Sequence, residues 1–184
     1  MTKDRFLAFT DAIIAIIATI MVLEFRTPKL ANFAALKELA VPVLAYAISF
    51  FMILGVWYNH HQLFRDITRI TPRIFAYNSV WLFVMSLFPF TTGWVGAEPN
   101  EVLPELLYIV ITMFWTASFH MMERELRREN PDAQRNEMTH TMPGAAIFAL
   151  LGLSAIIVWF FPPIGIISIG AMGIYSVGQL FLRN

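Results

Sequence analysis

The sequence lacks cysteine altogether and carries charge on only 14% of its 184 residues. The absence of cysteine excludes disulfide bonds, thiolate metal ligands and a cysteine nucleophile. Basic and acidic residues are equal in number, at 13 each, so no positive excess indicates a nucleic-acid partner. Disulfide-rich secreted domains, thiol enzymes and nucleic-acid-binding proteins are therefore all disfavoured.

Apolar side chains are present in surplus. Hydrophobic residues make up 58% of the chain and the mean hydropathy is +0.62, whereas a soluble domain is about 45–50% apolar with about 25% charge. The first apolar run continues into a membrane span and does not end at a small-residue cleavage site, so it does not resemble a cleavable signal peptide. The composition predicts an integral membrane protein.

Six apolar stretches have the length of a transmembrane helix, which needs about 20 residues. They cover about 6–25, 40–64, 73–95, 102–122, 143–161 and 164–182. Proline marks the connections "ITP", "EPNEVLP" and "FFPPIG", because it removes a hydrogen-bond donor and restricts the residue before it. We also expect a short amphipathic run, "NFAALKEL", and a polar loop over residues 123–140. The prediction is a single all-α integral membrane domain over residues 1–184, with six transmembrane helices.

The distribution of lysine and arginine predicts how the spans are oriented. With the N-terminus inside, ten basic residues fall on the cytoplasmic side and three, Arg26, Lys29 and Lys37, fall on the other. We therefore expect a multi-pass protein of the plasma membrane with both termini in the cytoplasm. The outer connections form either a mildly acidic mouth or ordinary solvated loops, and their acidic residues are Glu24, Glu38, Glu98, Glu101 and Glu105.

Three polar residues lie at one depth in the first three spans. Asp11, His60 and Asn78 each fall four or five residues from the inner end of their span, about 6–8 Å below the inner surface. Ionisable groups cost about 2.5–3.5 kcal/mol at mid-bilayer, so they indicate function by default. Arg5 lies about 120° from Asp11 around the helix, so the partner of Asp11 must come from another helix, with His60, Asn78 or Trp57 as candidates. The layer predicts a hydrogen-bonded clamp between helices, a proton relay, or support combined with gating.

The first span also carries a stripe of small and branched side chains. At 100° per residue the stripe occupies a sector of about 80°, and bulkier residues occupy the opposite side. Taken alone, such a stripe is typical of a helix-packing seam, with a pore lining as the alternative. The stripe comprises Ala8, Ala12, Ile16, Thr19 and Leu23, and the opposite side comprises Ile14, Ile17, Met21 and Phe25.

Short motifs in the first three spans resemble those of the transmembrane protein 175 family, the endosomal and lysosomal potassium channels and their bacterial relatives. "RFLAFTD" is similar to the family's Arg-x-x-x-Phe-Ser-Asp signature, with Thr10 in place of the usual serine. "AIIAIIAT", "WYNHHQLF" and "SLFPF" follow the family's pattern. Over the last three spans the resemblance is mainly one of hydropathy.

The resemblance implies a potassium-selective, leak-type channel in which four copies surround a pore lined by the first span. Ile16 would form the narrowest hydrophobic ring and Thr19 would help to select potassium ions, which would pass near both residues. Ala12, Ile20 and Leu23 would line the same pore. A structural and gating layer of hydrogen bonds would fix the rotation of this span, and its members would be Arg5, Phe9, Thr10, Asp11, Trp57, His60 and Asn78.

Several further expectations follow for partners and rival functions. We expect no enzymatic activity, no cofactor and no bound metal, with other copies of the chain, the lipid bilayer and permeant potassium as partners. A proton-permeable channel through the same pore and a non-conducting membrane scaffold remain as alternatives. A metal enzyme built from Asp11, His60 and His61 is disfavoured, because adjacent histidines point about 100° apart on a helix and no carboxylate-rich motif accompanies them.

Overall fold

The computed structural model describes residues 2–29, 31–131 and 144–182, which form helices joined by short connections. In chain order the elements are α1 (Lys3–Ile20), the 3₁₀ helix η1 (Met21–Glu24), α2 (Phe33–Glu38), α3 (Ala40–Phe64), α4 (Pro72–Met85), α5 (Phe88–Ala97), α6 (Val102–Glu129), α7 (Gly144–Ile157) and α8 (Ile164–Leu182). The predicted amphipathic run before the second span is the short helix α2.

Four segments are long and apolar enough to cross a bilayer: Lys3–Glu24, Ala40–Phe64, Pro72–Ala97 and Val102–Glu129. They coincide with the first four predicted spans, and α7 and α8 coincide with the last two. The α7 helix has only 14 residues, about 21 Å at 1.5 Å per residue, against about 30 Å for the hydrocarbon core. It is shorter than the predicted span because the chain turns from Val158 onward, ahead of Pro162 and Pro163. The prediction of an all-helical membrane protein is confirmed.

The third predicted span is interrupted in its middle. The α4 helix ends at Met85 and α5 begins at Phe88. Pro89 has no amide hydrogen to donate to the Met85 carbonyl, so the regular i→i−4 ladder cannot continue past this point. At the inner end, Thr71 caps α4 by accepting a hydrogen bond of 3.3 Å from the Ile74 amide, with Pro72 at the first helical position.

The α6 helix begins where the fourth predicted span begins, and it extends beyond the predicted end of that span. The helix already begins at Val102, inside "EPNEVLP", and it continues to Glu129. The prediction of a loop over residues 123–140 is therefore wrong for residues 123–129, where Arg127 donates to Glu123 one turn earlier at 2.6 Å and stabilises the helix. Residues 132–140 of that predicted loop lie outside the described residues.

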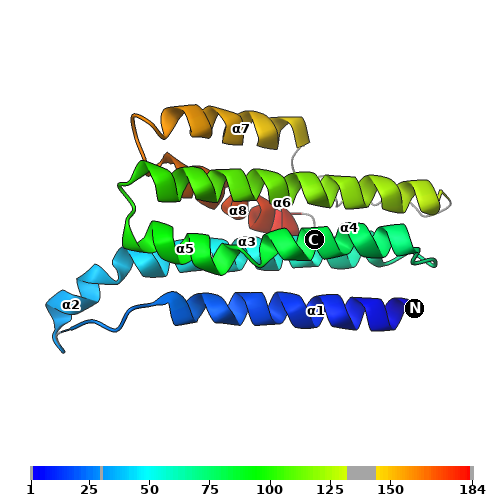
Figure 1. Cartoon of the computed structure of the whole chain (residues 1–184), viewed down its shortest axis with the longest axis horizontal. Helices are drawn as coiled ribbons and strands as arrows, with labels where there is room; N and C mark the ends of the chain where they lie inside the picture. Colours follow the sequence, from blue (N-terminus) through cyan, green and yellow to red (C-terminus); the bar gives the residue numbers. More distant parts are fainter. Residues whose placement is uncertain (1, 30, 132–143, 183–184) are drawn as a thin grey trace.

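The helices are arranged so that α1 lies along one edge of the molecule and α7 along the opposite edge (Figure 1). Between them, α3 to α6 pack around a core of buried aromatic rings. Phe88 contacts Trp115 at 4.9 Å and Tyr108 at 6.0 Å between ring centroids. The Ser49 hydroxyl lies 2.7 Å from both the Thr92 and the Tyr108 hydroxyls, which ties α3, α5 and α6 together. These helices form the platform on which α1 rests.

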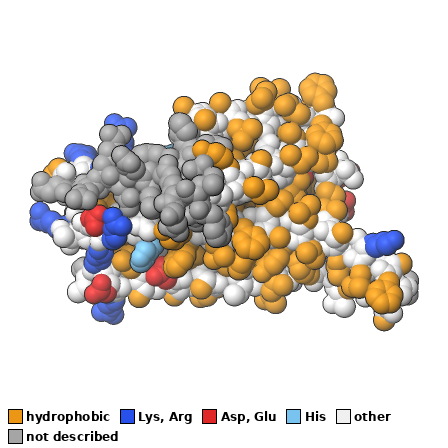
Figure 2. Space-filling view, turned by 180° about the vertical axis from the view of Figure 1, so that it is seen from behind, with side chains coloured by type: hydrophobic (Ala, Val, Ile, Leu, Met, Phe, Trp, Pro, Cys, Tyr) orange, Lys and Arg blue, Asp and Glu red, His pale blue; other side chains and the backbone are white. Residues whose placement is uncertain are grey.

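The surface divides into an apolar middle and a charged end. Hydrophobic side chains cover much of the face in Figure 2, while most of its lysines and arginines gather at the end that carries the N-terminus. The α2 helix projects from the opposite end, and its Phe33 is 88% exposed. This division matches the predicted span ends, where polar residues meet the headgroups of a bilayer.

Candidate functional site

The α1 helix buries one side and leaves the other exposed. The buried side repeats every three or four residues, the spacing of one helix face, and consists of Phe6, Thr10, Ile14, Ile17 and Met21. This face packs against α3, α4 and α5. The bulky side of the predicted wheel is thus the packing face.

The residues predicted to line a pore lie together on the exposed side. Ile16 is 56% exposed and Leu23 is 76% exposed, and Ala12, Thr19 and Ile20 are exposed as well. The α-helical geometry ends at Ile20, so Leu23 stands in the tighter η1 turn. The stripe therefore continues past the α-helix, although its last member does not follow the 100° spacing used to predict it.

The Thr19 hydroxyl is engaged with its own helix. It donates its hydrogen to the carbonyl oxygen of Ile16 at 2.9 Å or of Ala15 at 3.0 Å. A hydroxyl that donates inward keeps its two lone pairs as acceptors. The exposed Thr19 oxygen can therefore still accept a hydrogen bond or coordinate a cation.

A buried hydrogen-bonded chain joins α1 to α4 and α3. The Asn78 side-chain amide donates to the Thr10 hydroxyl at 2.9 Å, and its carbonyl oxygen lies 3.0 Å from His60 Nε2. All three side chains are fully buried. Because the Asn78 oxygen is the acceptor in this arrangement, His60 carries its hydrogen on Nε2. We call these three residues the inner clamp.

Asp11 and Trp57 form a second, separate contact. The Trp57 indole nitrogen donates to Asp11 Oδ1 at 2.8 Å, in a more exposed position one residue along α1 from Thr10. Of the three partners considered for Asp11, the structure selects Trp57. Arg5 is exposed and makes no hydrogen bond or ion pair within the described residues, and Phe9 is also exposed. The predicted layer thus resolves into two contacts, with Arg5 and Phe9 outside both.

Aromatic rings stack behind the inner clamp. His60 lies parallel to Trp81 at 4.9 Å, and Trp81 lies parallel to Trp115 at 6.1 Å. Neither tryptophan was predicted to belong to this layer. Trp81 lies three residues after Asn78 on the same face of α4. This spacing could have predicted that Trp81 packs beside the inner clamp.

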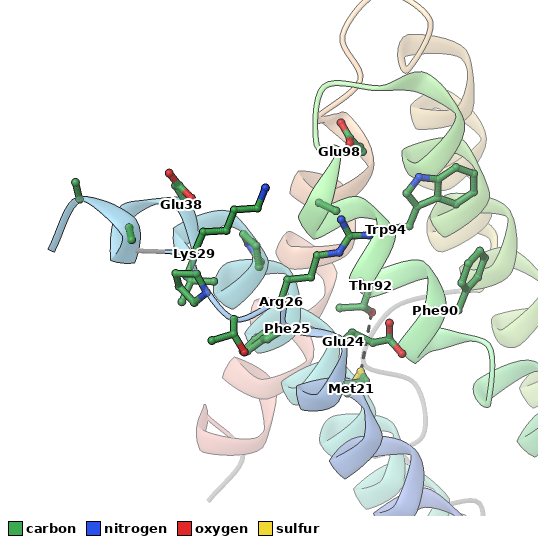
Figure 3. Close-up of a pocket in the computed structure, with 18 of the residues that line it drawn as sticks. Met21, Glu24, Phe25, Arg26, Lys29, Glu38, Phe90, Thr92, Trp94 and Glu98 are labelled. Atoms are coloured by element: carbon green, nitrogen blue, oxygen red, sulfur yellow. Dashed lines mark hydrogen bonds between the residues drawn. The ribbon is translucent and has the colours of Figure 1, made fainter. Parts of the chain in front are cut away.

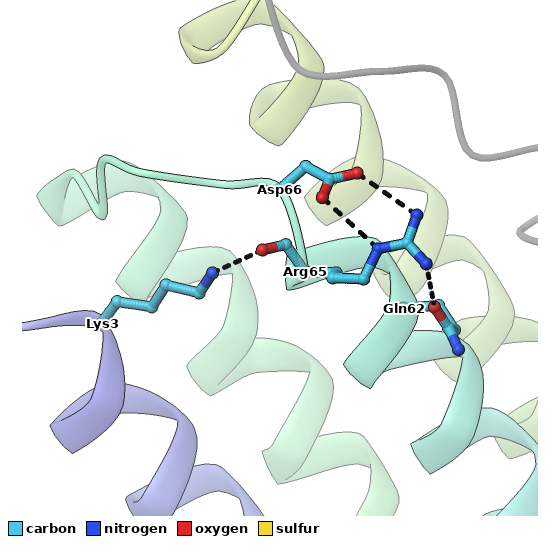
Figure 4. A network of polar contacts seen from close by, with 4 residues as sticks. All are labelled: Lys3, Gln62, Arg65 and Asp66. Atoms are coloured by element: carbon cyan, nitrogen blue, oxygen red, sulfur yellow. Dashed lines mark hydrogen bonds and ion pairs between the residues drawn. The ribbon is translucent and has the colours of Figure 1, made fainter.

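Lys3 forms a further contact between the inner end of α1 and the end of α3, which was not predicted from the sequence. Its ammonium donates to the Arg65 carbonyl at 2.8 Å, and Arg65 itself contacts Gln62 and Asp66 (Figure 4). A cation is favourable at the C-terminus of α3, where carbonyl groups lack helical partners. The first turn of α1 is therefore held to the last turn of α3.

The outer end of α1 opens on a groove of about 1000 Å³ between η1, α2 and α5. Figure 3 shows Arg26 extending toward Trp94 on α5. Glu24, Glu38 and Glu98 line the groove together with Arg26 and Lys29, which leaves a small negative excess. Glu105 is not part of this mouth, contrary to the acidic-mouth interpretation: it is buried and accepts a hydrogen bond of 2.8 Å from the Ile166 amide.

The site offers no obvious means of binding a metal. Within residues 2–29, 31–131 and 144–182 there is no group of three or more potential metal-binding side chains. The Nε2 atom of His60 is occupied by Asn78. What the site presents is a helix with one face anchored at several points and an apolar, hydroxyl-bearing stripe on the other.

Comparisons with known proteins place this arrangement in context. A family model described as the endosomal/lysosomal potassium channel TMEM175 matches residues 5–89, which include α1, the inner clamp and the Asp11–Trp57 contact. A potassium channel of Chryseobacterium sp. is 32% identical over 170 residues, covering 90% of this chain and 88% of that protein. The endosomal/lysosomal proton channel TMEM175 of Danio rerio is 30% identical over 117 residues, covering 61% of this chain and 22% of that protein.

A solved structure has the same fold. The crystal structure of a lysosomal potassium-selective channel TMEM175 homolog from Chamaesiphon minutus matches with a TM-score of 0.82, covering 96% of each chain at 21% sequence identity. The likeness extends over α7 and α8, where sequence motifs are weakest.

Proposed function

The chain belongs to the TMEM175 family, and from this premise we propose that it forms a potassium-selective, leak-type channel. In the proposed assembly four copies surround a central axis, and each contributes the exposed stripe of α1. The chain acts as a single domain with six spans, α7 and α8 forming the last two. Its location is the plasma membrane, with both termini in the cytoplasm.

The observation that carries the proposal is the two-sided character of α1. Its buried face is anchored to α3, α4 and α5, while its exposed face combines large aliphatic side chains with the exposed Thr19 oxygen. Around a shared axis, the exposed stripe of each copy would face the stripes of the other copies and line the pore.

Selectivity follows from the chemistry of the stripe. Four Ile16 side chains form a narrow apolar neck in which water is unstable, so an ion loses much of its hydration shell. Four Thr19 oxygens replace part of the lost coordination one turn further out, and Ala12, Ile20 and Leu23 line the rest of the passage. Potassium sheds water at lower cost than sodium, so the neck favours potassium. The proposed ion positions lie near Ile16 and Thr19.

The inner clamp sets the rotation of α1. One residue of slip turns an α-helix by about 100°, which would carry Ile16 out of the neck. The Thr10–Asn78–His60 chain and the Asp11–Trp57 bond oppose such a turn, and Lys3 holds the helix end. We assign Arg5 and Phe9 to the inner opening of the pore, where both are exposed.

A proton-permeable channel is the second candidate. Relatives in Danio rerio and Homo sapiens carry the name proton channel, and protons can pass a narrow neck that hydrated ions cannot. A non-conducting scaffold is the third candidate, and the potassium channel names of the bacterial relatives weigh against it. No enzymatic chemistry is proposed.

Recordings from the purified chain in planar bilayers test the proposal. Under bi-ionic conditions with potassium and sodium, we expect a reversal potential that reports a preference for potassium, and mass measurement of the assembly should give four copies. A reversal potential that follows only the proton gradient would select the proton channel. A silent bilayer with folded protein, or a purified monomer, would refute the potassium channel.

A further inference from the structure

A cluster of arginines surrounds one carboxylate where α4 begins and α6 ends. Arg73 is the second residue of α4, and Arg124 and Arg128 stand in the last turns of α6 on either side of Glu125. Arg69 is placed nearby because its amide donates to the Asn130 side chain at 3.4 Å, just after α6.

Two of these arginines converge on Glu125 without forming hydrogen bonds to it. Arg73 Nη1 lies 3.7 Å from Oε1 and Arg128 Nη1 lies 3.8 Å from Oε2, distances too long for a hydrogen bond. Glu125 is only 10% exposed, whereas the two arginine side chains are 66% and 69% exposed. The carboxylate thus has one guanidinium group near each of its oxygens, and both arginine side chains remain largely exposed.

Arg127 provides a contrast within the same turn. It donates to Glu123 at 2.6 and 3.2 Å, so its guanidinium is already committed to a partner in the protein. Within the described residues, Arg73 and Arg128 have no comparable hydrogen bond. The guanidinium donors of Arg73 and Arg128 therefore have no hydrogen-bonded partner among the described residues.

The charge and position of the cluster favour an anion at the membrane surface. Four arginines and two glutamates, Glu125 and Glu129, leave a net charge of +2. The cluster lies at the ends of two predicted spans, at the same end of the molecule as the N-terminus (Figures 1 and 2). Arginine at this depth meets phospholipid headgroups, and guanidinium forks match the geometry of a phosphate.

We propose that Arg73 and Arg128 together bind the phosphate of an anionic phospholipid in the cytoplasmic leaflet. The lipid bridges α4 and α6, with Arg69 and Arg124 adding attraction from nearby. The proposal depends on the membrane orientation given above, but not on ion conduction. It assigns a lipid partner to the inner end of the subunit, where α4 begins and α6 ends.

Native mass spectrometry of the purified full-length chain, titrated with phosphatidylglycerol or phosphatidylcholine in detergent, tests the site. Each arginine near an anionic lipid contributes roughly a fivefold factor in affinity, so Arg73→Gln with Arg128→Gln should weaken phosphatidylglycerol binding about 25-fold. Phosphatidylcholine has the same phosphate but a cationic choline that neutralises it, so it should bind weakly to the wild type and the double variant alike. Arg26→Gln at the opposite end removes the same charge and serves as the matched control, with wild-type binding expected.

Four outcomes would overturn the proposal. The first is undiminished phosphatidylglycerol binding by the double variant, and the second is an equal loss in the Arg26→Gln control. The third is competition by free glycerol phosphate at the same concentration, which would indicate a soluble ligand. The fourth outcome uses the wild type and applies even if the double variant does not fold. Binding of phosphatidylglycerol to the wild type should weaken as sodium chloride is added, and salt-insensitive binding would contradict an electrostatic site. Potassium flux, recorded separately, distinguishes failure of this site from failure of the channel.

Discussion

Replacing Thr10 with valine exchanges a buried hydroxyl for a methyl group of nearly the same volume. The exchange leaves packing intact and removes one acceptor, so the Asn78 amide loses its partner at 2.9 Å in a site closed to water. An unpaired buried donor costs about 1–3 kcal/mol. For a chain of this length, a loss of about 2 kcal/mol lowers Tm by about 4–8 °C. Because Thr10 is the only member of the inner clamp on α1, potassium selectivity should fall together with stability.

The assay compares Thr10→Val with Thr10→Ser. Serine keeps the hydroxyl and loses only a methyl group, so it should remain close to the wild type in both readouts. Thermal unfolding of the purified protein, followed by tryptophan fluorescence, gives the stability, and bi-ionic recording gives the selectivity. If valine melts at the wild-type temperature, or if serine is the more damaging change, the hydrogen bond to Asn78 does not anchor α1 and the reasoning fails.

Three further substitutions test the role of the exposed stripe independently of the contacts that anchor α1. Ile16→Asn should raise conductance and weaken potassium selectivity, because a polar ring hydrates the neck; unchanged single-channel currents would place the neck elsewhere. Thr19→Val removes the exposed oxygen but keeps the shape, so the permeability ratio of potassium to sodium should fall in bi-ionic recordings while the assembly mass stays the same. Trp57→Phe removes a half-exposed hydrogen bond of 2.8 Å to Asp11 and should cost about 0.5–1.5 kcal/mol in thermal unfolding, less than Thr10→Val.

The helices were predictable from the sequence because apolar length is a strong signal. The first four predicted spans coincide with the segments able to cross a bilayer. The polar residues of the inner clamp were also foreseeable: His60 and Asn78 are expensive in an apolar span unless they meet another polar group. Their shared depth on separate helices predicted that they would lie together.

The pairing within that layer was not predictable. Choosing between Trp57 and His60 as the partner of Asp11 requires the rotation of two helices, which hydropathy does not define. The same holds for Glu105, which was grouped with exposed glutamates although it is buried against Ile166. Its position depends on how the α7–α8 hairpin packs onto α6, a long-range contact with no local signature.

The end of α6 was missed for a different reason. Residues 123–129 are mostly polar, and a polar composition between two apolar spans predicts a loop. Their charges alternate at a spacing that supports a helix, with Arg127 one turn after Glu123. Charge spacing was therefore more informative there than charge content.

The interruption at Ser86 and Leu87 divides the third predicted span into two helices that contact different parts of the first span. The inner helix, α4, binds Thr10 through the side-chain amide of Asn78. The outer helix, α5, packs against η1, where Gly93 leaves room for the side chain of Glu24. In the proposed channel, the inner and outer parts of the first span are therefore supported by different helices, so a substitution in α5 can affect η1 without passing through the Asn78–Thr10 hydrogen bond.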